Sequence, residues 1–144
     1  MSEQNYNNHA RLDTGYHRIL FPILLLTFIG SCVNLNHSLG DHQRLYSASL
    51  ITVITMSLVA VALYARIFAL KAQDRAIRAE ENLRHYVLTG KLLDARLTPK
   101  QIVALRFASD AELVELAPKA ASSALDPKVI KQAIKQWKAD DYRV

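Results

Sequence analysis

The chain has 144 residues, a formal net charge of +5 and a single cysteine. One cysteine excludes an intramolecular disulfide and any metal site built from several cysteines. The charge is uneven, because in residues 1–46 three arginines balance three carboxylates and the whole positive excess follows residue 46. Such a basic region favours anionic lipid headgroups as a partner, and nucleic acid is the less favoured one.

Two segments, residues 19–35 and 47–65, contain no charged residue. Because a membrane-spanning helix needs about 20 mostly apolar residues, we predict spans at residues 19–36 and 47–70. Arg66 is compatible with the second span, since a long side chain near a helix end can carry its charge to the interface. The alternative is a soluble core, but neither segment has the polar stripe that core helices usually carry.

The basic residues beside the predicted spans indicate their orientation. The connection of residues 36–46 carries only Arg44. Five basic residues lie at or beyond the end of the second span: Arg66, Lys71, Arg75, Arg78 and Arg84. Since cytoplasmic flanks carry the excess of Lys and Arg, we expect both termini in the cytoplasm. The first four of these five residues are expected to contact lipid headgroups.

Cys32 leaves one alternative open. Arg18, the apolar run and residues 28–32 resemble a bacterial lipoprotein signal, in which cleavage would leave Cys32 acylated. The stretch before the apolar run is long for a signal peptide, and Gly30 and Ser31 are poor residues at their positions. We therefore favour an uncleaved span, and an intact mass would distinguish the two.

The second helix is predicted to continue beyond the membrane as an arm over residues 71–90. Neither proline nor glycine interrupts the chain from Ser47 until Gly90, a natural helix terminator. Glu80 and Arg84 are four residues apart, which would support an exposed helix.

Residues 91–144 are predicted to form a small module of three helices. Three helix starts with capping residues are present: Thr98 with Pro99 and Gln101, Ser109 with Glu112, and Asp126 with Pro127. Pro118 is expected to kink or split the middle helix. Apolar residues follow each start, and they would pack on one another, on the arm or on a partner. We expect six of them to bind a partner helix: Phe107, Leu113, Leu116, Ile130, Ile134 and Trp137.

The last helix is predicted to carry four lysines along one side: Lys128, Lys131, Lys135 and Lys138. The simplest interpretation is a solvated face, followed by docking on a membrane surface. Nucleic-acid binding ranks last, because no nucleic-acid fold motif accompanies the lysines.

No convincing catalytic or metal-binding constellation is present. His37, Asp41 and His42 share the short connection, but their spacing matches no recognised ligand pattern. The charge-free segments of both spans offer no group for a proton path, so a one-copy carrier is disfavoured. We expect no enzymatic activity, no cofactor and no metal.

Three segments resemble an uncharacterised bacterial domain-of-unknown-function family: QNYNNH at residues 4–9, ALRFASDAEL at 104–113 and IKQAIKQWKADDYRV at 130–144. The resemblance implies a small two-span protein of the bacterial inner membrane and supplies no activity or catalytic residue. A disordered tail would need no particular residues at positions 4–9, so this polar block is expected to dock on the cytoplasmic helices.

The expected fold is an all-α membrane protein, with a two-helix transmembrane hairpin whose long second helix extends into a small cytoplasmic helical module. Its parts are a polar segment (1–18), the hairpin (19–70), the arm (71–90) and the module (91–144). The function expected first is that of a non-enzymatic adaptor or accessory subunit of a larger membrane complex. The alternatives are a self-associating structural protein or oligomeric pore, packed through Gly30 and Ser31, and a membrane-tethered lipid or nucleic-acid binder acting through the last helix.

Overall fold

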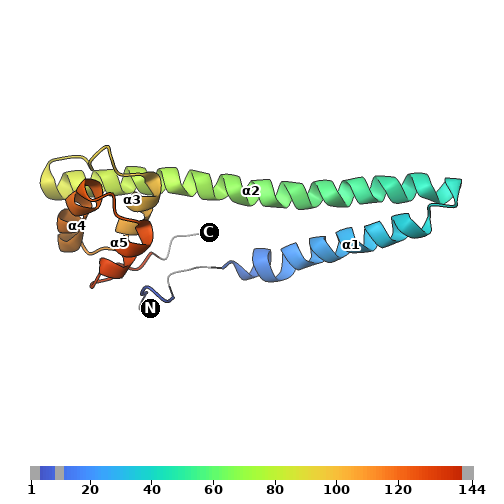
Figure 1. Cartoon of the computed structure of the whole chain (residues 1–144), viewed down its shortest axis with the longest axis horizontal. Coiled ribbons are helices and arrows are strands. Elements are labelled where there is room, and N and C mark those ends of the chain that lie inside the picture. Colours follow the sequence, from blue (N-terminus) through green and yellow to red (C-terminus); the bar gives the residue numbers. More distant parts are fainter. Residues whose placement is uncertain (1–3, 9–11, 141–144) are drawn as a thin grey trace. The chain divides into compact units, whose positions relative to one another are not determined.

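The computed structural model describes residues 4–8 and 12–140, and its regular elements there are all helical (Figure 1). The elements in chain order are η1 (Gly15–Leu20), α1 (Phe21–His37), α2 (His42–Thr89), α3 (Pro99–Leu105), α4 (Asp110–Ser122) and α5 (Pro127–Ala133). They belong to two compact units. The hairpin unit comprises residues 12–69, and the module unit comprises residues 70–140 with residues 4–8.

The hairpin unit is held by a seam of small and hydroxylated residues. Ser31 Oγ lies 2.9 Å from Thr55 Oγ1, and Thr52 Oγ1 donates a hydrogen bond to the Ser31 carbonyl at 3.2 Å. Ser31, Thr55 and Ala48 are all buried. Small side chains allow two helix backbones to approach closely. Ser31 therefore serves packing within the hairpin, whereas the self-association alternative had assigned it to contact between copies.

The first apolar helix begins earlier than predicted. Helical structure starts at Gly15, so that a continuous helix of 23 residues runs to His37. Its first turn, η1, is a π-helix. Pro22 lies just beyond it and has no N–H for the carbonyl of Arg18, and the crowding of its ring against that carbonyl favours a wider turn. Asp13 fixes the start, because its side chain accepts a hydrogen bond from the Tyr16 amide at 2.7 Å.

The second helix, α2, is continuous for 48 residues. Asp41 caps its start by accepting from the Gln43 amide at 3.0 Å. It ends at Thr89, and Gly90 follows with a φ of +73°, a conformation that favours glycine. The predicted end of the second helix at Gly90 is confirmed.

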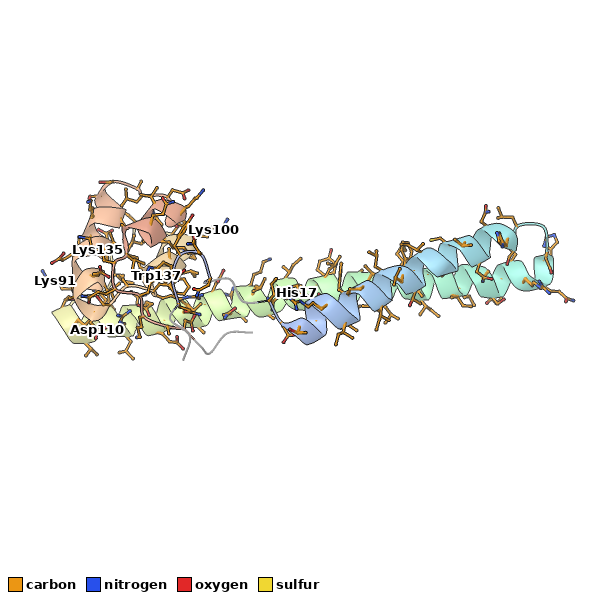
Figure 2. All side chains as sticks on the ribbon, turned by 90° about the horizontal axis from the view of Figure 1, so that it is seen from below. His17, Lys91, Lys100, Asp110, Lys135 and Trp137 are labelled. Carbon is orange, nitrogen blue, oxygen red and sulfur yellow. The ribbon has the colours of Figure 1, made fainter. Side chains whose placement is uncertain are left out.

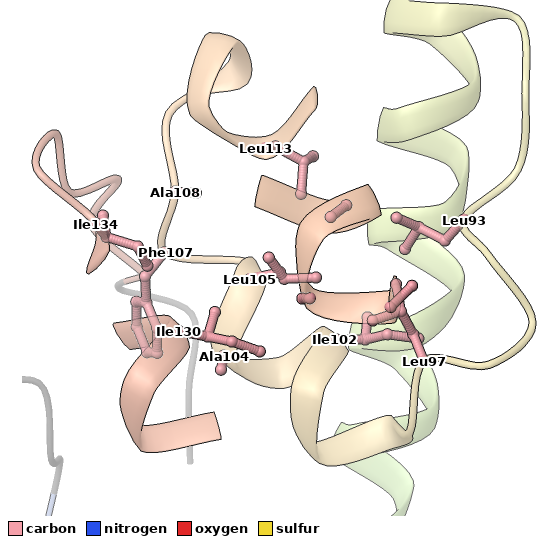
Figure 3. Close-up of a cluster of buried hydrophobic side chains, with 13 residues drawn as sticks. Leu93, Leu97, Ile102, Ala104, Leu105, Phe107, Ala108, Leu113, Ile130 and Ile134 are labelled. Atoms are coloured by element: carbon pink, nitrogen blue, oxygen red, sulfur yellow. The ribbon is translucent and has the colours of Figure 1, made fainter. Parts of the chain in front are cut away.

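The core of the module unit is built by α3, α4, α5 and the loop after α2 (Figure 3). α3 packs against both α4 and α5. Leu93 and Leu97 close the core from the loop, while Leu92 stays exposed. The last part of α2 belongs to the same unit and buries Ile77 and His85. The three short helices thus pack on one another, which was one of the three expected arrangements.

All three predicted helix starts are confirmed. Thr98 forms a complete capping box with Gln101, Ser109 accepts from the Glu112 amide, and Asp126 accepts from the Lys128 amide at 2.8 Å. Of the two outcomes expected at Pro118, a split of the middle helix is wrong, because α4 runs unbroken through it, and a kink stays a prediction. Pro118 lies on the exposed face of α4, where solvent can reach the carbonyl that loses its helical donor.

The predicted last helix is too long. α5 ends at Ala133, and Ile134 is already extended. Beyond it, the chain pairs backbone to backbone with the segment before α4: Ser109 N donates to Gln136 O at 3.1 Å, and Lys138 N donates to Phe107 O at 2.7 Å. These bonds replace the helical ones, so the four lysines do not form one helical stripe.

Candidate interaction surface

The six residues expected to bind a partner lie mainly inside the module unit. Phe107, Leu113 and Ile130 have no exposed surface, and Ile134 is buried beside them (Figure 3). Leu116 and Trp137 pack against this core and are partly buried. The chain itself covers most of this set, so a partner surface must be sought elsewhere.

Trp137 marks where the C-terminal segment closes over the core. Its ring lies 5.1 Å from the ring of Phe107, and its indole N–H donates to the Ile134 carbonyl at 3.2 Å. Trp137 belongs to the module unit (Figure 2). As the only tryptophan of the chain, it reports on this unit alone.

Glu112 joins the start of α4 to the C-terminal segment. Its two carboxylate oxygens accept hydrogen bonds from the backbone amides of Lys135 and Gln136, at 2.9 and 3.1 Å. The sequence suggested that this carboxylate would complete the cap of its own helix. It instead satisfies two amides that lie beyond the end of α5 and have no helical acceptor.

Arg84 connects α2 to α4. Its guanidinium contacts Glu81 at 3.0 Å and Asp110 at 2.6 Å, and donates to the Ala108 carbonyl at 2.8 Å. The sequence had suggested Glu80 as its partner. Glu80 is exposed and lies outside this network.

The polar block near the N-terminus docks on the module unit, as predicted. Asp140 N donates to the Gln4 side-chain carbonyl at 2.8 Å, and the Gln4 amide nitrogen donates back to Asp140 O at 3.4 Å. Tyr6 lines a shallow surface pocket together with Lys128 and Lys131. His9, the last residue of the block, lies outside the described residues.

Four large apolar side chains at the end of α2 and in the loop after it are more than half exposed. Leu83 is 63% exposed, Tyr86 52%, Val87 75% and Leu92 67%. Three of them lie on one face of α2, because positions three and four residues apart are neighbours on a helix. A water-exposed apolar group of this kind commonly marks a protein or membrane contact. These four residues form the candidate interaction surface.

The basic residues assigned to lipid headgroups lie along α2. Lys71, Arg75 and Arg78 are exposed, and Arg66 lies with its guanidinium carbon 5.9 Å from the Tyr16 ring centroid within the hairpin unit. Of the four lysines near the C-terminus, only Lys128 and Lys131 lie on α5.

One cavity of the module unit has a charged lining but no free catalytic pair. It has a volume of about 180 Å³ and is lined by residues that include Glu81, Arg106 and Asp140. Arg106 Nε lies 3.1 Å from Asp140 Oδ2, and Arg84 holds Glu81. Among residues 4–8 and 12–140 there is no cluster of three side chains suited to a metal ion.

The carboxyl group of Asp94, in the loop after α2, has a strongly lowered pKa. The Arg96 side chain and backbone amide both donate to Asp94, at 2.7 and 2.9 Å, and lower the pKa of that carboxyl from 3.8 to about 2. The same pair raises the pKa of Arg96. Asp94 also accepts the Leu97 amide through its carbonyl at 3.0 Å. These hydrogen bonds close a turn over residues 94–97, which shapes the loop between α2 and α3.

The model of a family of unknown function, DUF6526, matches residues 1–144. The chain belongs to this family. No curated protein and no solved structure matches it. Membership in DUF6526 therefore assigns no activity, and any function must come from the physical features of the two units.

The exposed surface of this DUF6526 chain was missed in the sequence for an identifiable reason. Leu83, Tyr86 and Val87 interrupt a highly charged stretch, which we interpreted as an exposed helix stabilised by ion pairs. The available signal was the spacing of three and four residues, which repeats here as it does in the buried helices. Only the structure separates the face of α2 that carries Ile77 and His85 from the face that stays uncovered.

Proposed function

We propose that the chain is a non-enzymatic integral protein of the bacterial inner membrane, which acts as an adaptor or accessory subunit of a membrane complex. Its hairpin unit spans the lipid, and its module unit binds protein partners in the cytoplasm. The observation that carries the adaptor role is the exposed apolar surface of Leu83, Tyr86, Val87 and Leu92, on a unit whose own core is already closed.

The exposure of the two long helices supports the membrane part of the proposal. Of the most apolar 18-residue stretch in each, only 6% and 11% is buried. Large apolar side chains project outward along the hairpin unit (Figure 2). Exposure of this surface to water would be unfavourable, whereas its contact with lipid chains would be favourable. A helix buried in a soluble core would instead be covered by the protein.

The hydroxyl groups of the hairpin also suit a hydrocarbon environment, where polar groups must find partners within the protein. Thr27 donates to Ile23 O at 2.7 Å, and Ser57 donates to Val53 O at 2.8 Å. Both side chains lie on the exposed surface of their helix, and each hydroxyl group donates its hydrogen bond to the backbone of that same helix.

The length of α2 and its charges suggest the arrangement in the membrane. At about 1.5 Å per residue its 48 residues extend over about 72 Å, more than twice the hydrocarbon thickness of about 30 Å. The basic residues after Ala65 favour the cytoplasm for its second half. The module unit would then face the cytoplasm, with Lys71, Arg75 and Arg78 in the region of the headgroups.

Photo-cross-linking in native membranes tests the adaptor role. A photoreactive amino acid at Val87 should give discrete adducts with other proteins, whereas the same group at Lys119, an exposed position on α4, should give none. Val87 adducts that disappear when Leu83 is changed to Gln would support the apolar surface as the contact. Equal labelling from both positions, or no adduct from Val87, would contradict the proposal.

A further inference from the structure

The uncovered face of α2 in the module unit carries a regular pattern. Alternating steps of four and three residues lead from Ala72 through Ala76 and Ala79 to Leu83 and Tyr86. All five are exposed. This spacing is the heptad repeat of coiled coils, in which such positions face a second helix. Ala65 and Ala69 continue the pattern towards the N-terminus and are exposed as well.

Ala72, Ala79, Leu83 and Tyr86 lie on the side of α2 opposite its buried residues, while Ala76 also borders the cavity that contains Arg106 and Asp140. Ile77, Glu81 and His85 are buried on the inner side of α2. Ala79, Leu83 and Val87 each follow one of them by two positions, a rotation of about 200° around the helix. A second helix can therefore approach the uncovered face without displacing the core of the module unit.

The charges that flank the pattern indicate that the helix packed against this face is α2 of a second copy. With Ala72 and Ala79 at position d of the heptad, Arg75 falls at position g and Glu80 at position e. In a parallel pair of identical helices in register, position g of one helix faces position e of the next heptad on the other, five residues on. Arg75 would then face Glu80 of a second copy. Both side chains are exposed, and Arg84 is engaged with Glu81 and Asp110 instead.

We propose that two copies of this chain pair through α2 as a parallel, in-register coiled coil, with Ala72, Ala76, Ala79, Leu83 and Tyr86 along the contact. This inference rests on the proposed function, because two copies inserted with the same topology present their α2 helices in parallel. The alanines let the backbones come close, and Leu83 and Tyr86 supply the larger buried area. Val87 and Leu92 lie outside this contact and stay available to the protein partner of the proposed function. Confinement of both copies to one membrane compensates for the short contact by raising their effective concentration.

Thiol cross-linking of the full chain in native membranes tests the register. In a background in which Cys32 is changed to Ala, Ala79→Cys and Leu83→Cys should each cross-link to the same position of a second copy through a short bifunctional reagent. Arg78→Cys lies on the same exposed helix but off the contact, and should give at most a trace of dimer. Equal cross-linking at Arg78 and Ala79, or none at Ala79 and Leu83, would overturn the proposal.

A charge exchange tests the same contact without altering its apolar residues. Arg75→Glu or Glu80→Arg alone should lower the cross-linked fraction at Leu83 about threefold or more, since each places like charges opposite one another. The two changes together should restore it. Failure of the double change to restore cross-linking would contradict the parallel register.

The outcomes separate this inference from the function on which it rests. Absence of cross-linking at Ala79 and Leu83, together with Val87 adducts to other proteins, would overturn the pairing of two copies and leave the adaptor role intact. A chain recovered in the soluble fraction without detergent would instead overturn the membrane function, whatever its state of association.

Discussion

Replacing Arg84 should destabilise the module unit more than any other single change of an arginine on α2. The side chain of Arg84 is 12% exposed and that of Glu81 is 9% exposed, so their ion pair is largely desolvated. Arg84→Ala leaves the Glu81 carboxylate and the Ala108 carbonyl without this donor. The pair with Asp110 adds little, because the Asp110 side chain is 65% exposed and screened by solvent.

The expected magnitude follows from these contacts. A hydrogen bond to a charged group contributes about 1.5–3 kcal/mol, and loss of one partner of a buried ion pair costs about 3–5 kcal/mol. We expect Arg84→Ala to lower the free energy of unfolding by about 3–5 kcal/mol. Arg84→Lys keeps the charge but cannot reproduce the several N–H donors of the guanidinium. It should lower the free energy of unfolding by about 1.5–3 kcal/mol.

Denaturant unfolding of the full chain in mild detergent, followed by Trp137 fluorescence, measures this effect. The single tryptophan reports on the module unit and not on the hairpin. Arg78→Ala is the matched control, because Arg78 is exposed on the same helix and should change stability by about 0.5 kcal/mol or less. If Arg84→Ala were no more destabilising than Arg78→Ala, the network joining α2 to α4 would not exist as described.

Three further predictions concern the loop and the two chain ends. Glu112→Ala should cost about 1–3 kcal/mol in the same assay, because two backbone amides lose a charged acceptor; an unchanged midpoint would refute the link. Asp94 should titrate near pH 2 by carboxyl NMR, and Arg96→Ala should return its midpoint towards 3.8. Since this pKa is lowered by folding, the stability it contributes is complete above about pH 4 and is lost as the pH falls through about 2. Gln4→Ala should speed hydrogen exchange at the Asp140 amide, and an unchanged rate would argue against docking of the N-terminal segment.

The elements that could be predicted from the sequence are those governed by local chemistry. Thr98, Ser109 and Asp126 start helices because their side chains accept backbone amides within three residues, and Gly90 ends α2 because it adopts a positive φ. The two apolar helices follow from length and composition alone.

The features that the sequence did not reveal depend on contacts between distant segments. The end of α5 at Ala133 follows from pairing with residues 107–109 and from Glu112, more than 20 residues earlier in the chain. Leu113 and Leu83 have similar apolar character, yet one is buried and the other exposed. The pattern within each helix identifies a face, but only the packing of α3, α4 and α5 decides which face is covered.

The measurement that tests the account most directly is the location of the full chain and of its C-terminal end. With a protease-sensitive tag after Val144, we expect the chain to stay with the membrane through an alkaline wash. The tag should be cleaved in inside-out vesicles and protected in sealed cells. Recovery of the chain in solution without detergent, or cleavage of the tag from outside sealed cells, would contradict the account.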